Sequence, residues 1–243
     1  MKAAVRLNNV YKLFMSQTAD GKHIVALDDV SLEIESGSFT IIGGANGSGK
    51  SVLMNVISGL MDPSDGTVET STKPGLVFQD AATQILGDSP REDVAVGPAN
   101  MGISKKDIPN LVEKALSSVS LSEKADFPAE FLSGGEKRRL AVASILAMDK
   151  DIIIFDEPYA NLDYSGVLDV NSLLKDLHEK GKTIILLTHE LEKCLGLCSH
   201  FIIMEKGKIV FDGRPEDALK TDLTKWSIKN PLAKYERLSD LVW

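Results

Sequence analysis

The segment that most restricts the fold is a glycine-rich loop at 44–51, flanked by two short apolar runs. It matches G-x-x-x-x-G-K-[ST] at every fixed position. The run before it, 39–43 (FTIIG), is typical of a buried strand, and 52–60 after it has apolar residues at helical spacing. A strand, a glycine loop and a helix in this order predict a phosphate-binding loop. Its residues are Gly44, Ala45, Asn46, Gly47, Ser48, Gly49, Lys50 and Ser51.

Each residue type in this loop has its own physical role toward a phosphate group. Glycines let backbone N–H groups approach phosphate oxygens, and the helix that starts near Ser51 aims its positive end at the same anion. Lys50 supplies a charge for the β- and γ-phosphates, and the Ser51 hydroxyl is a ligand for Mg²⁺. The alternative, a glycine-rich turn with a chance lysine, fits the matched positions poorly. The loop does not name a reaction, because GTPases, kinases and ATPases share it.

Two carboxylates follow a second buried run, 151–155 (DIIIF). Ligands of α/β sheets bind at the carboxyl ends of strands. Asp156 is therefore placed to hold Mg²⁺, and Glu157 to polarise an attacking water as a general base. The alternative is a solvated pair at a strand end. The upstream loop, and Pro158, which stiffens the exit, favour the functional interpretation.

The order of strands and helices predicts the fold class. Residues 30–34 alternate apolar and polar, as in a half-buried strand. The runs 151–155 and 183–188 are apolar without alternation, which suits a parallel sheet covered on both faces. The helical pattern at 165–178 lies between them and completes a βαβ unit. The class is therefore α/β.

The middle of the chain has a different pattern. Residues 81–147 are rich in helical periodicity and poor in strand-like runs, with the clearest helices at 111–119 and 136–148. We interpret this part as a mostly helical insertion in the α/β domain. Further on, 201–204 and 208–211 flank a Lys-Gly turn and predict a hairpin.

Length and charge set broader limits. The chain has 243 residues, enough for one large domain, which we expect at 1–217, followed by a short helical tail at 218–243. Its 27 basic and 35 acidic residues give a net charge of −8, which argues against a general nucleic-acid binder. Residues 1–12 lack the apolar core of a secretory signal. No apolar run reaches the roughly 18–20 residues of a membrane span.

The two cysteines, Cys194 and Cys198, are too few for a disulfide framework, so the reducing cytosol is the default compartment. With His200 they make a possible metal cluster. Two cysteines four apart on an expected helix, with one histidine, fall short of a zinc pattern. We therefore expect core or surface thiols.

A third motif, LSGGE, begins at Leu132 and precedes a helix. Its serine and glycines form a helix N-terminus whose free N–H groups can bind an anion. The simpler interpretation is a capping box between the serine and the glutamate three residues later. The two are compatible, because a rigid, capped helix start is a good phosphate ligand. The residues concerned are Ser133, Gly134, Gly135 and Glu136.

These motifs together resemble those of the ATP-binding-cassette (ABC) ATPases, the nucleotide-binding subunits of transporters. LSGGE resembles the family's LSGGQ, and IIIFDEP resembles its second nucleotide motif. Residues 160–163 resemble its D-loop, 188–189 its switch histidine and 77–79 its Q-loop. The order and spacing match over about 3–217. The resemblance implies a P-loop NTPase (RecA-like) core with an N-terminal antiparallel β portion and an inserted, mostly helical subdomain.

The resemblance also implies a mechanism that needs two subunits, packed head to tail with ATP and Mg²⁺ between them. The loop of one subunit and the LSGGE of the other would then enclose the nucleotide. By this resemblance Ser133, Gly134 and Gly135 contact the γ-phosphate held by the partner, with Glu136 completing the motif. The implied catalytic residues are Lys50, Gln79, Glu157 and His189, with Ser51, Gln79 and Asp156 at the metal and Asp163 bridging the subunits.

An aromatic residue near the N-terminus often stacks on adenine in this family. Phe14 is the position that lines up, and Tyr11 is the competitor. The alternative is an ordinary core aromatic.

Within the family, 79–102 resembles the ATPases of energy-coupling-factor (ECF) transporters, a group that includes cobalt-uptake ATPases. Gln84, Glu92 and Asp93 fit that pattern, whereas 81–83 depart from it. The resemblance implies an importer of a vitamin or a transition-metal ion at the cytoplasmic face of the membrane. Its implied partners are a second ATPase, identical or paralogous, a membrane scaffold protein and a substrate-binding membrane protein, and no nucleic acid.

Two local expectations follow. Asp88, Glu92 and Asp93 form an acidic cluster, and we expect Glu92 and Asp93 to receive arginines of the membrane partner. The alternative is a solvated acidic face. The segment 66–79 is shorter than is usual in the family, and we expect a trimmed surface hairpin there.

Three other functions are less well supported. A soluble ABC protein acting in DNA repair or translation generally carries long coiled coils or two cassettes, and this chain shows neither. A non-hydrolysing regulatory cassette does not fit intact Lys50, Glu157 and His189. An ATPase of another ABC transporter type remains as the main alternative to the ECF group.

Overall fold

The computed structural model describes residues 2–15 and 23–234. In this part of the chain the central element is a six-stranded sheet of order β5-β6-β7-β3-β8-β9. Its pairs are parallel except for β8 and β9, which are antiparallel. The strands are β5 (Gly75–Val77), β6 (Ile152–Asp156), β7 (Thr183–Leu187), β3 (Phe39–Gly43), β8 (His200–Glu205) and β9 (Lys208–Gly213).

Both faces of this sheet are covered, which explains why β6 is apolar at each of its first four positions. Ile152 and Ile154 of β6 belong to one hydrophobic core, while Ile153 and Phe155 belong to the other. Successive side chains of a strand point to opposite faces, so a strand with a core on each side needs an apolar residue at every position.

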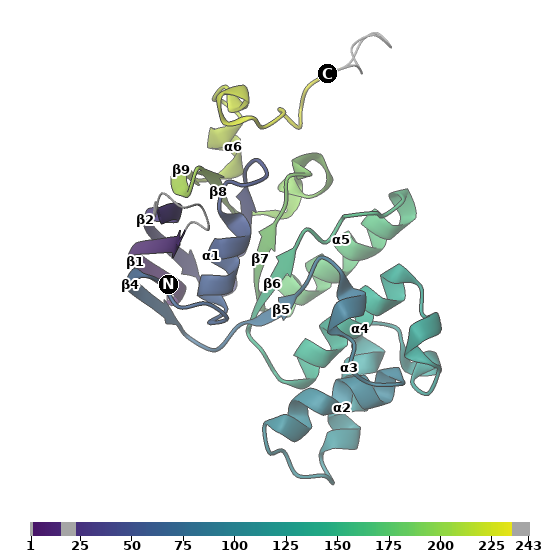
Figure 1. The fold of residues 1–243 in the computed structure, drawn as a ribbon. Coiled ribbons are helices and arrows are strands. Elements are labelled where there is room, and N and C mark those ends of the chain that lie inside the picture. The colour runs from purple at the N-terminus through teal and green to yellow at the C-terminus, as the bar shows by residue number, and fades with distance from the viewer. Residues whose placement is uncertain (1, 16–22, 235–243) are drawn as a thin grey trace.

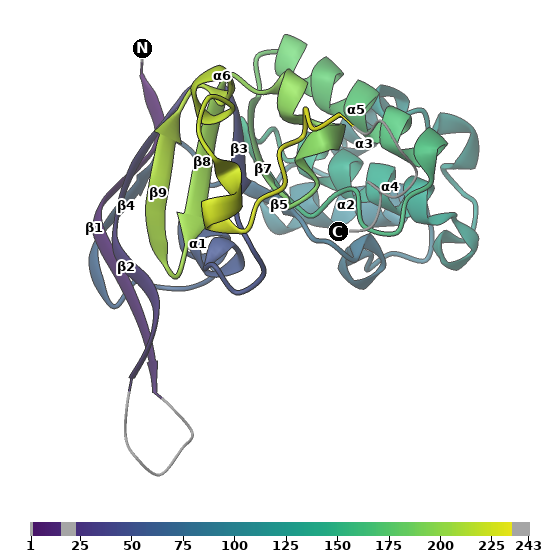
Figure 2. The same ribbon diagram turned by 90° about the horizontal axis from the view of Figure 1, so that it is seen from above.

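The first face packs against α1 (Lys50–Ile57) and a three-stranded antiparallel sheet of order β2-β1-β4. Leu53, Met54 and Val56 of α1 share one core with residues of both sheets. Figure 1 shows α1 between the two sheets, and Figure 2 shows β1 and β2 extending together past the central sheet. The strands are β1 (Ala3–Met15), β2 (His23–Glu35) and β4 (Asp65–Thr70).

The second face packs against α5 (Tyr164–Glu179) and a group of helices between residues 81 and 147 (Figure 1). These helices share a single core with Phe155 and Leu186 of the sheet. They are α2 (Pro90–Asn100), α3 (Ile108–Ser118) and α4 (Gly134–Ala147), with 3-10 turns η1 (Ala81–Gln84), η2 (Ser122–Lys124) and η3 (Ala129–Phe131).

Most of the predicted strands and helices are present, with small shifts in their ends. The run 39–43 is β3, and the βαβ unit is formed by β6, α5 and β7, with β6 and β7 parallel neighbours. The hairpin at 201–211 is β8 and β9. The helix expected at 52–60 starts two residues earlier, directly after Gly49, and ends at Ile57, before Gly59 with its positive φ of 70°.

The prediction of a hairpin at 66–79 is wrong. β4 pairs with β1 in the antiparallel sheet, and β5 pairs with β6 at the edge of the central sheet. The segment therefore crosses from one sheet to the other. Turn-forming residues at 71–74 predict a reversal locally, but the buried Gly-Leu-Val of β5 finds its partner in a strand about 80 residues away in sequence.

The chain ends its described part in short helical pieces. These are α6 (Pro215–Ala218) and η6 (Leu223–Trp226), and the Trp226 ring lies 6.3 Å from that of Phe211 on β9. Two further 3-10 turns, η4 (Leu191–Lys193) and η5 (Leu195–Leu197), follow β7. The expected tail at 218–243 is described only to residue 234. None of the described helices combines the length and the apolar content that crossing a bilayer requires.

The structure corrects the expected role of Asp93. Its side chain is buried, Oδ1 accepts hydrogen bonds from the backbone N–H groups of Leu86 (2.7 Å) and Gly87 (3.2 Å), and Oδ2 accepts one from Ser144 Oγ (2.7 Å). Asp93 therefore holds the loop before α2 against α4 and does not face a partner. The cluster of acidic residues predicted a surface patch here. The backbone N–H groups of Leu86 and Gly87 need a hydrogen-bond acceptor, however, and buried Asp93 supplies it.

We predict that Asp93→Ala lowers the free energy of unfolding by about 1–3 kcal/mol, because it leaves buried N–H groups without an acceptor. Urea denaturation measures the change. Asp88→Ala, an exposed aspartate on the same loop, is the matched control and should cost much less. Equal losses in the two variants would contradict the structural role of Asp93.

Candidate functional site

The loop between β3 and α1 has a backbone that only glycine adopts easily. Gly44, Gly47 and Gly49 have φ values of 144°, 78° and 106°. A Cβ at Gly44 would lie 2.4 Å from the Met204 carbonyl oxygen, and one at Gly49 would lie 2.8 Å from that of Ala26. The loop is thus pressed against its neighbours on both sides, and it leads directly into the first turn of α1.

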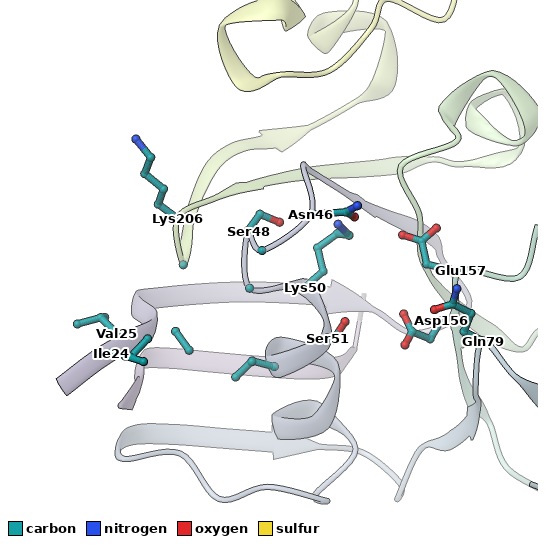
Figure 3. A pocket seen from close by; sticks show the side chains of 15 residues that line it. Ile24, Val25, Asn46, Ser48, Lys50, Ser51, Gln79, Asp156, Glu157 and Lys206 are labelled. Atoms are coloured by element: carbon teal, nitrogen blue, oxygen red, sulfur yellow. The ribbon is translucent and has the colours of Figure 1, made fainter. Parts of the chain in front are cut away.

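A cavity of about 510 Å³ opens over this loop. Figure 3 shows Gln79, Asp156 and Glu157 grouped on one side of it, facing Lys50 and Ser51, with Lys206 and Ile24 at the other side. The lining thus joins β2, the loop, the ends of β5 and β6, and the β8–β9 turn. The residues that line it are Ile24, Val25, Ala26, Asn46, Gly47, Ser48, Gly49, Lys50, Ser51, Val52, Gln79, Asp156, Glu157, Lys206 and Gly207.

Lys50 is buried at the base of the cavity, and its Nζ donates to the carbonyl oxygens of Gly44 (2.7 Å) and Ala45 (3.2 Å). Burial lowers its pKa, and the nearby charges of Glu157 and Asp156 oppose that shift. Ser48 Oγ is buried as well and has no hydrogen-bond partner among the described residues. A buried cation and an unpaired hydroxyl on a glycine loop fit a bound phosphate chain.

The two carboxylates lie at the end of β6. Burial raises the pKa of Asp156, and the adjacent Glu157 raises it further. Glu157 has a positive φ of 44°, and its backbone N–H donates to the Leu187 carbonyl at the end of β7 (2.9 Å). Such a conformation is uncommon for a residue other than glycine and is typical of sites where the surroundings hold a side chain in place.

Oxygen atoms suited to Mg²⁺ face the same cavity. Ser51, Gln79 and Asp156 line it together and offer a hydroxyl, an amide oxygen and a carboxylate. These are the ligand types that this cation takes. The three residues predicted to hold a metal are therefore brought together by the fold, from α1, the exit of β5 and the end of β6.

His189 lies beside Glu157. Its Nδ1 is 3.0 Å from Glu157 Oε1, and its backbone N–H donates to Oε2 at 3.4 Å. The sequence predicted both residues as catalytic but not this contact. The pair forms because β6 and β7 are parallel neighbours, so the segments that follow them leave the sheet at the same edge.

Gln79 follows β5 and lines two cavities, the one over the loop and a second of about 400 Å³ between η1, α4 and the 160–162 turn. Arg138 of α4 is buried beside it and donates from Nη2 to the Gln79 carbonyl at 3.5 Å. Burial lowers the pKa of Arg138. The sequence did not predict that Arg138 is buried at this site, because a basic residue near the polar start of a helix is usually exposed.

The LSGGE segment forms the predicted capping box at the start of α4. Ser133 Oγ accepts from the Glu136 N–H (3.3 Å), and Glu136 Oε2 accepts from the Ser133 N–H (2.9 Å). Lys124 Nζ donates to Glu136 Oε1 at 2.6 Å, and these bonds lower the pKa of Glu136 to about 2. A Cβ at Gly134 or Gly135 would meet nothing within 4 Å, so the helix start is open.

None of the five LSGGE residues lines the cavity over the phosphate loop. Ser133 and Gly134 lie on the helical part of the chain, whereas the loop belongs to the central sheet. The chain by itself therefore does not bring its two anion-binding segments together.

Known proteins are similar to this chain in sequence. A family model described as "ABC transporter" matches residues 27–160. The chain is 40% identical over 225 residues to the energy-coupling factor transporter ATP-binding protein EcfA1 of Clostridium novyi, covering 86% of this chain and 79% of that protein.

Two solved structures are similar in fold. One is cbiO1 of Clostridium perfringens, described as part of the ABC transporter complex cbiONQ, with a TM-score of 0.79, 30% identity and coverage of 90% of this chain and 92% of that one. The other is a dimeric, post-hydrolysis state of an ATP-binding cassette bound to ADP and Pi, with a TM-score of 0.75, 28% identity and coverage of 87% and 98%.

The chain belongs to the ABC transporter ATPases. It binds and hydrolyses ATP, and its relatives include ATP-binding proteins of energy-coupling factor transporters. The predicted α/β fold with a P-loop core, an antiparallel N-terminal sheet and inserted helices is confirmed.

Apart from the LSGGE residues, five predicted site residues of this ABC ATPase lie outside the cavity lining. Gly44, Ala45 and His189 line a second cavity of about 440 Å³, and the other two are Asp163 and Phe14. Asp163 caps α5, where Oδ1 accepts from the N–H of Gly166 (2.8 Å) and from Ser165 Oγ (3.0 Å), and these bonds lower its pKa. Phe14 pairs with Ile24 across β1 and β2, and Ile24, not Phe14, lines the cavity. The structure thus places Phe14 next to the cavity without a lining contact, and its role stays a prediction.

Lys206 and Gly207 of the β8–β9 turn line the cavity and were missed by sequence reasoning. A Lys-Gly pair between two strands indicates only a turn. What brings it to the site is the position of β8 beside β3, which sequence pattern does not reveal.

Cys194 and Cys198 lie between β7 and β8. No group of three or more potential ligands is found in the described ranges 2–15 and 23–234. Cys194 is buried and Cys198 half-buried, and burial raises the pKa of both thiols, that of Cys198 to about 12. The prediction that both cysteines lie on one helix is wrong, because Cys194 and Cys198 lie at the ends of the 3-10 turns η4 and η5. His200 instead contacts Asp212 on β9 (2.5 Å).

The low pKa of Glu136 makes its stabilising effect dependent on pH. Its folded-state pKa of about 2 lies below the ordinary 4.5, so the contribution is complete above pH 4.5 and is lost as pH falls toward 2. We predict that Glu136→Gln unfolds at lower urea concentration than the wild type at pH 7, and that the gap narrows by pH 3.5.

Glu69→Gln, on the exposed side of β4, is the control and should show no such narrowing. A gap between Glu136→Gln and the wild type that stays constant with pH would contradict the charged contact with Lys124.

Proposed function

We propose that this ABC ATPase is the motor subunit of an ECF-type importer for a vitamin or a transition-metal ion. The observation that carries the hydrolytic part is the grouping of Lys50, Asp156 and Glu157 in one cavity over the phosphate loop. The ECF assignment is supported by the similarity to EcfA1 and by the pattern at 79–102. An ATPase of another ABC transporter type is the alternative.

In this proposal the phosphates of ATP bind along the N–H groups of residues 46–51, and Lys50 turns from the Gly44 carbonyl to the phosphate oxygens. Mg²⁺, when bound, would neutralise charge on the β- and γ-phosphates. Ser51, Gln79 and Asp156 are the residues that would hold it.

Glu157 acts as the general base in this scheme and takes the proton of the attacking water. The His189 imidazole, 3.0 Å from Oε1, orients that carboxylate and faces the γ-phosphate. Two turns that leave neighbouring parallel strands thus supply the two groups nearest to the bond that breaks.

The separation of LSGGE from the phosphate loop supports a site shared between two subunits. Ser133, Gly134 and Gly135 would close over the nucleotide of a second ATPase, and Asp163 would lie at the contact between subunits. The dimeric state of a similar cassette supports this arrangement. The second subunit is an identical chain or a paralogue.

The proposed role of Glu157 has a direct test. We predict that Glu157→Gln lowers kcat for ATP hydrolysis by about 10²–10⁴-fold, because the amide does not accept the proton of water. Nucleotide affinity, measured by equilibrium binding of ATP, should change little. Glu205→Gln, at the end of β8 in the same sheet, is the matched control. Equal kcat for Glu157→Gln and wild type would refute the general-base role.

A groove of about 470 Å³ on the helical part is the proposed contact with the membrane partner. Leu86, Asp88, Glu130 and Lys137 line it. Leu86 is 76% exposed, and Phe131, next to Glu130 in sequence, is 69% exposed. Exposed apolar side chains together with the carboxylates of Asp88 and Glu130 suit a short partner helix that carries arginines.

Asp88 and Glu130 take the place of Asp93 in this proposal, because Asp93 is buried. Glu92 is exposed, its Oε2 accepts from the Asp88 N–H at 3.2 Å, and it keeps its expected role toward arginines of the partner.

We predict that the double variant Asp88→Lys and Glu130→Lys loses co-purification with the membrane partners while it retains ATP binding. The reason is that the reversed charges would repel arginines of the partner. Glu69→Lys with Glu179→Lys, two exposed sites on β4 and α5, carries the same change in net charge and should co-purify normally. Unchanged co-purification of the first variant would remove this surface from the proposal.

The remaining parts of the proposal concern organisation and place in the cell. The ATPase domain would span 1–217 with a helical subdomain at 81–147, and 218–243 would form the tail. The subunit would lie at the cytoplasmic face of the membrane, bound to a scaffold protein and a substrate-binding protein and to no nucleic acid. The net charge of −8 and the exposed groove support these assignments.

A further inference from the structure

Two consecutive buried hydrogen bonds connect the turn after β6 to the turn after β7. The Tyr159 side chain is only 1% exposed, and its hydroxyl donates to Asn171 Oδ1 on α5 at 2.6 Å. Asn171 Nδ2 donates in turn to the Lys193 carbonyl oxygen at 2.8 Å. The side-chain amide of Asn171 thus makes hydrogen bonds to both turns at once.

Tyr159 and Lys193, the residues at the two ends of this hydrogen-bond series, lie close to Glu157 and His189 in sequence. The Ala160 N–H, next to Tyr159, donates to the Glu157 carbonyl at 3.2 Å. The Lys193 N–H donates to the Glu190 carbonyl at 3.1 Å, and the Lys193 ammonium forms an ion pair with the Glu190 carboxylate. Tyr159 is therefore anchored to the Glu157 turn, and Lys193 to the residue that follows His189.

The direct contact between His189 and Glu157 is a weak anchor by itself. The His189 side chain is 56% exposed, and its backbone bond to Glu157 is long, at 3.4 Å. Water competes for the exposed imidazole, while the Glu157 side chain is only 13% exposed, so this contact alone holds the two loops weakly in one relative position. The buried Tyr159–Asn171 bond has no such competition from water.

The Tyr159 hydroxyl is suited to a permanent role as a donor. Burial raises its pKa, and the adjacent Cys194 thiol raises it further, so it stays protonated throughout the neutral range. A phenylalanine would fill the same space and remove only the hydroxyl. The Lys193 ammonium, 5.9 Å from the centre of the Tyr159 ring, adds a cation–π contact that this substitution preserves.

We propose that Tyr159 is a positioning residue for ATP hydrolysis, which acts through Asn171 and Lys193 to hold His189 against the Glu157 carboxylate. The proposal rests on the assigned roles of Glu157 and His189. A displacement of about 1 Å in such a pair can cost up to about 10²-fold in rate, so loss of this anchor should affect catalysis more than nucleotide binding.

The test compares Tyr159→Phe with Tyr164→Phe, whose ring is 79% exposed at the start of α5. Both are made in the full chain, purified with the subunits that co-elute with it. Tyr159→Phe should lower kcat by about tenfold with KM for ATP within about twofold, and Tyr164→Phe should match the wild type. Asn171→Ala should have the same effect, and the double variant with Tyr159→Phe should be no slower than the slower single variant.

A second readout follows the imidazole directly. In the full chain, the side-chain ¹⁵N resonances of His189, assigned by their loss in His189→Gln, should shift in Tyr159→Phe, while those of His178 and His200 stay in place. A variant that melts earlier but keeps kcat and the His189 resonances would overturn the proposal, since Tyr159 would then only stabilise the fold. So would a rise in KM at constant kcat.

The Glu157→Gln variant separates this proposal from the one it rests on. If Glu157→Gln hydrolyses ATP at the wild-type rate, the assigned site is wrong. If Glu157→Gln is inactive and Tyr159→Phe is fully active, only the positioning role fails.

Discussion

The turn from β3 into α1 leaves no space for a side chain at Gly44, because an added Cβ would lie 2.4 Å from the Met204 carbonyl oxygen. This close approach ties the phosphate loop to β8, the strand beside β3. Lys50 Nζ therefore lies against the Gly44 carbonyl oxygen of the loop. The first turn of α1 follows directly, and its free N–H groups are placed to bind an anion. Every other group of the cavity is positioned relative to this turn.

The parallel sheet brings the remaining groups to the same edge. β5, β6 and β7 run in one direction, so Gln79, Glu157 and His189 follow strand ends that lie side by side. The positive φ of Glu157 and the Tyr159–Asn171 bond belong to the turns that leave this edge. The geometry of the proposed catalytic groups is thus set by short, irregular segments whose ends are fixed by a rigid sheet.

Local pattern was enough to predict the parts of the fold that depend on neighbours in sequence. The apolar run of β3, the βαβ unit around α5 and the capping box at Ser133 all follow from spacing and residue type. The phosphate loop was recognisable for the same reason.

The parts that could not be predicted depend on contacts between distant segments. β5 pairs with β6 and not with β4, so the hairpin expected at 66–79 does not form. Asp93 is polar yet buried, because unpaired N–H groups of a loop require it. Lys206 reaches the cavity, and Tyr159 reaches Asn171, only through the packing of strands and helices. Burial of a polar side chain leaves no periodic signal in sequence.

We propose that the phosphate loop of this chain is half of an ATP site. This can be tested by the structure of the Glu157→Gln ATPase in complex with its partner subunits, with ATP and Mg²⁺ added. We expect the triphosphate along residues 46–51, with Lys50 moved from the Gly44 carbonyl to the phosphates and an LSGGE-type helix start of the second ATPase on the γ-phosphate. A nucleotide held at the loop with that helix start facing solvent, or bound elsewhere on the chain, would contradict it.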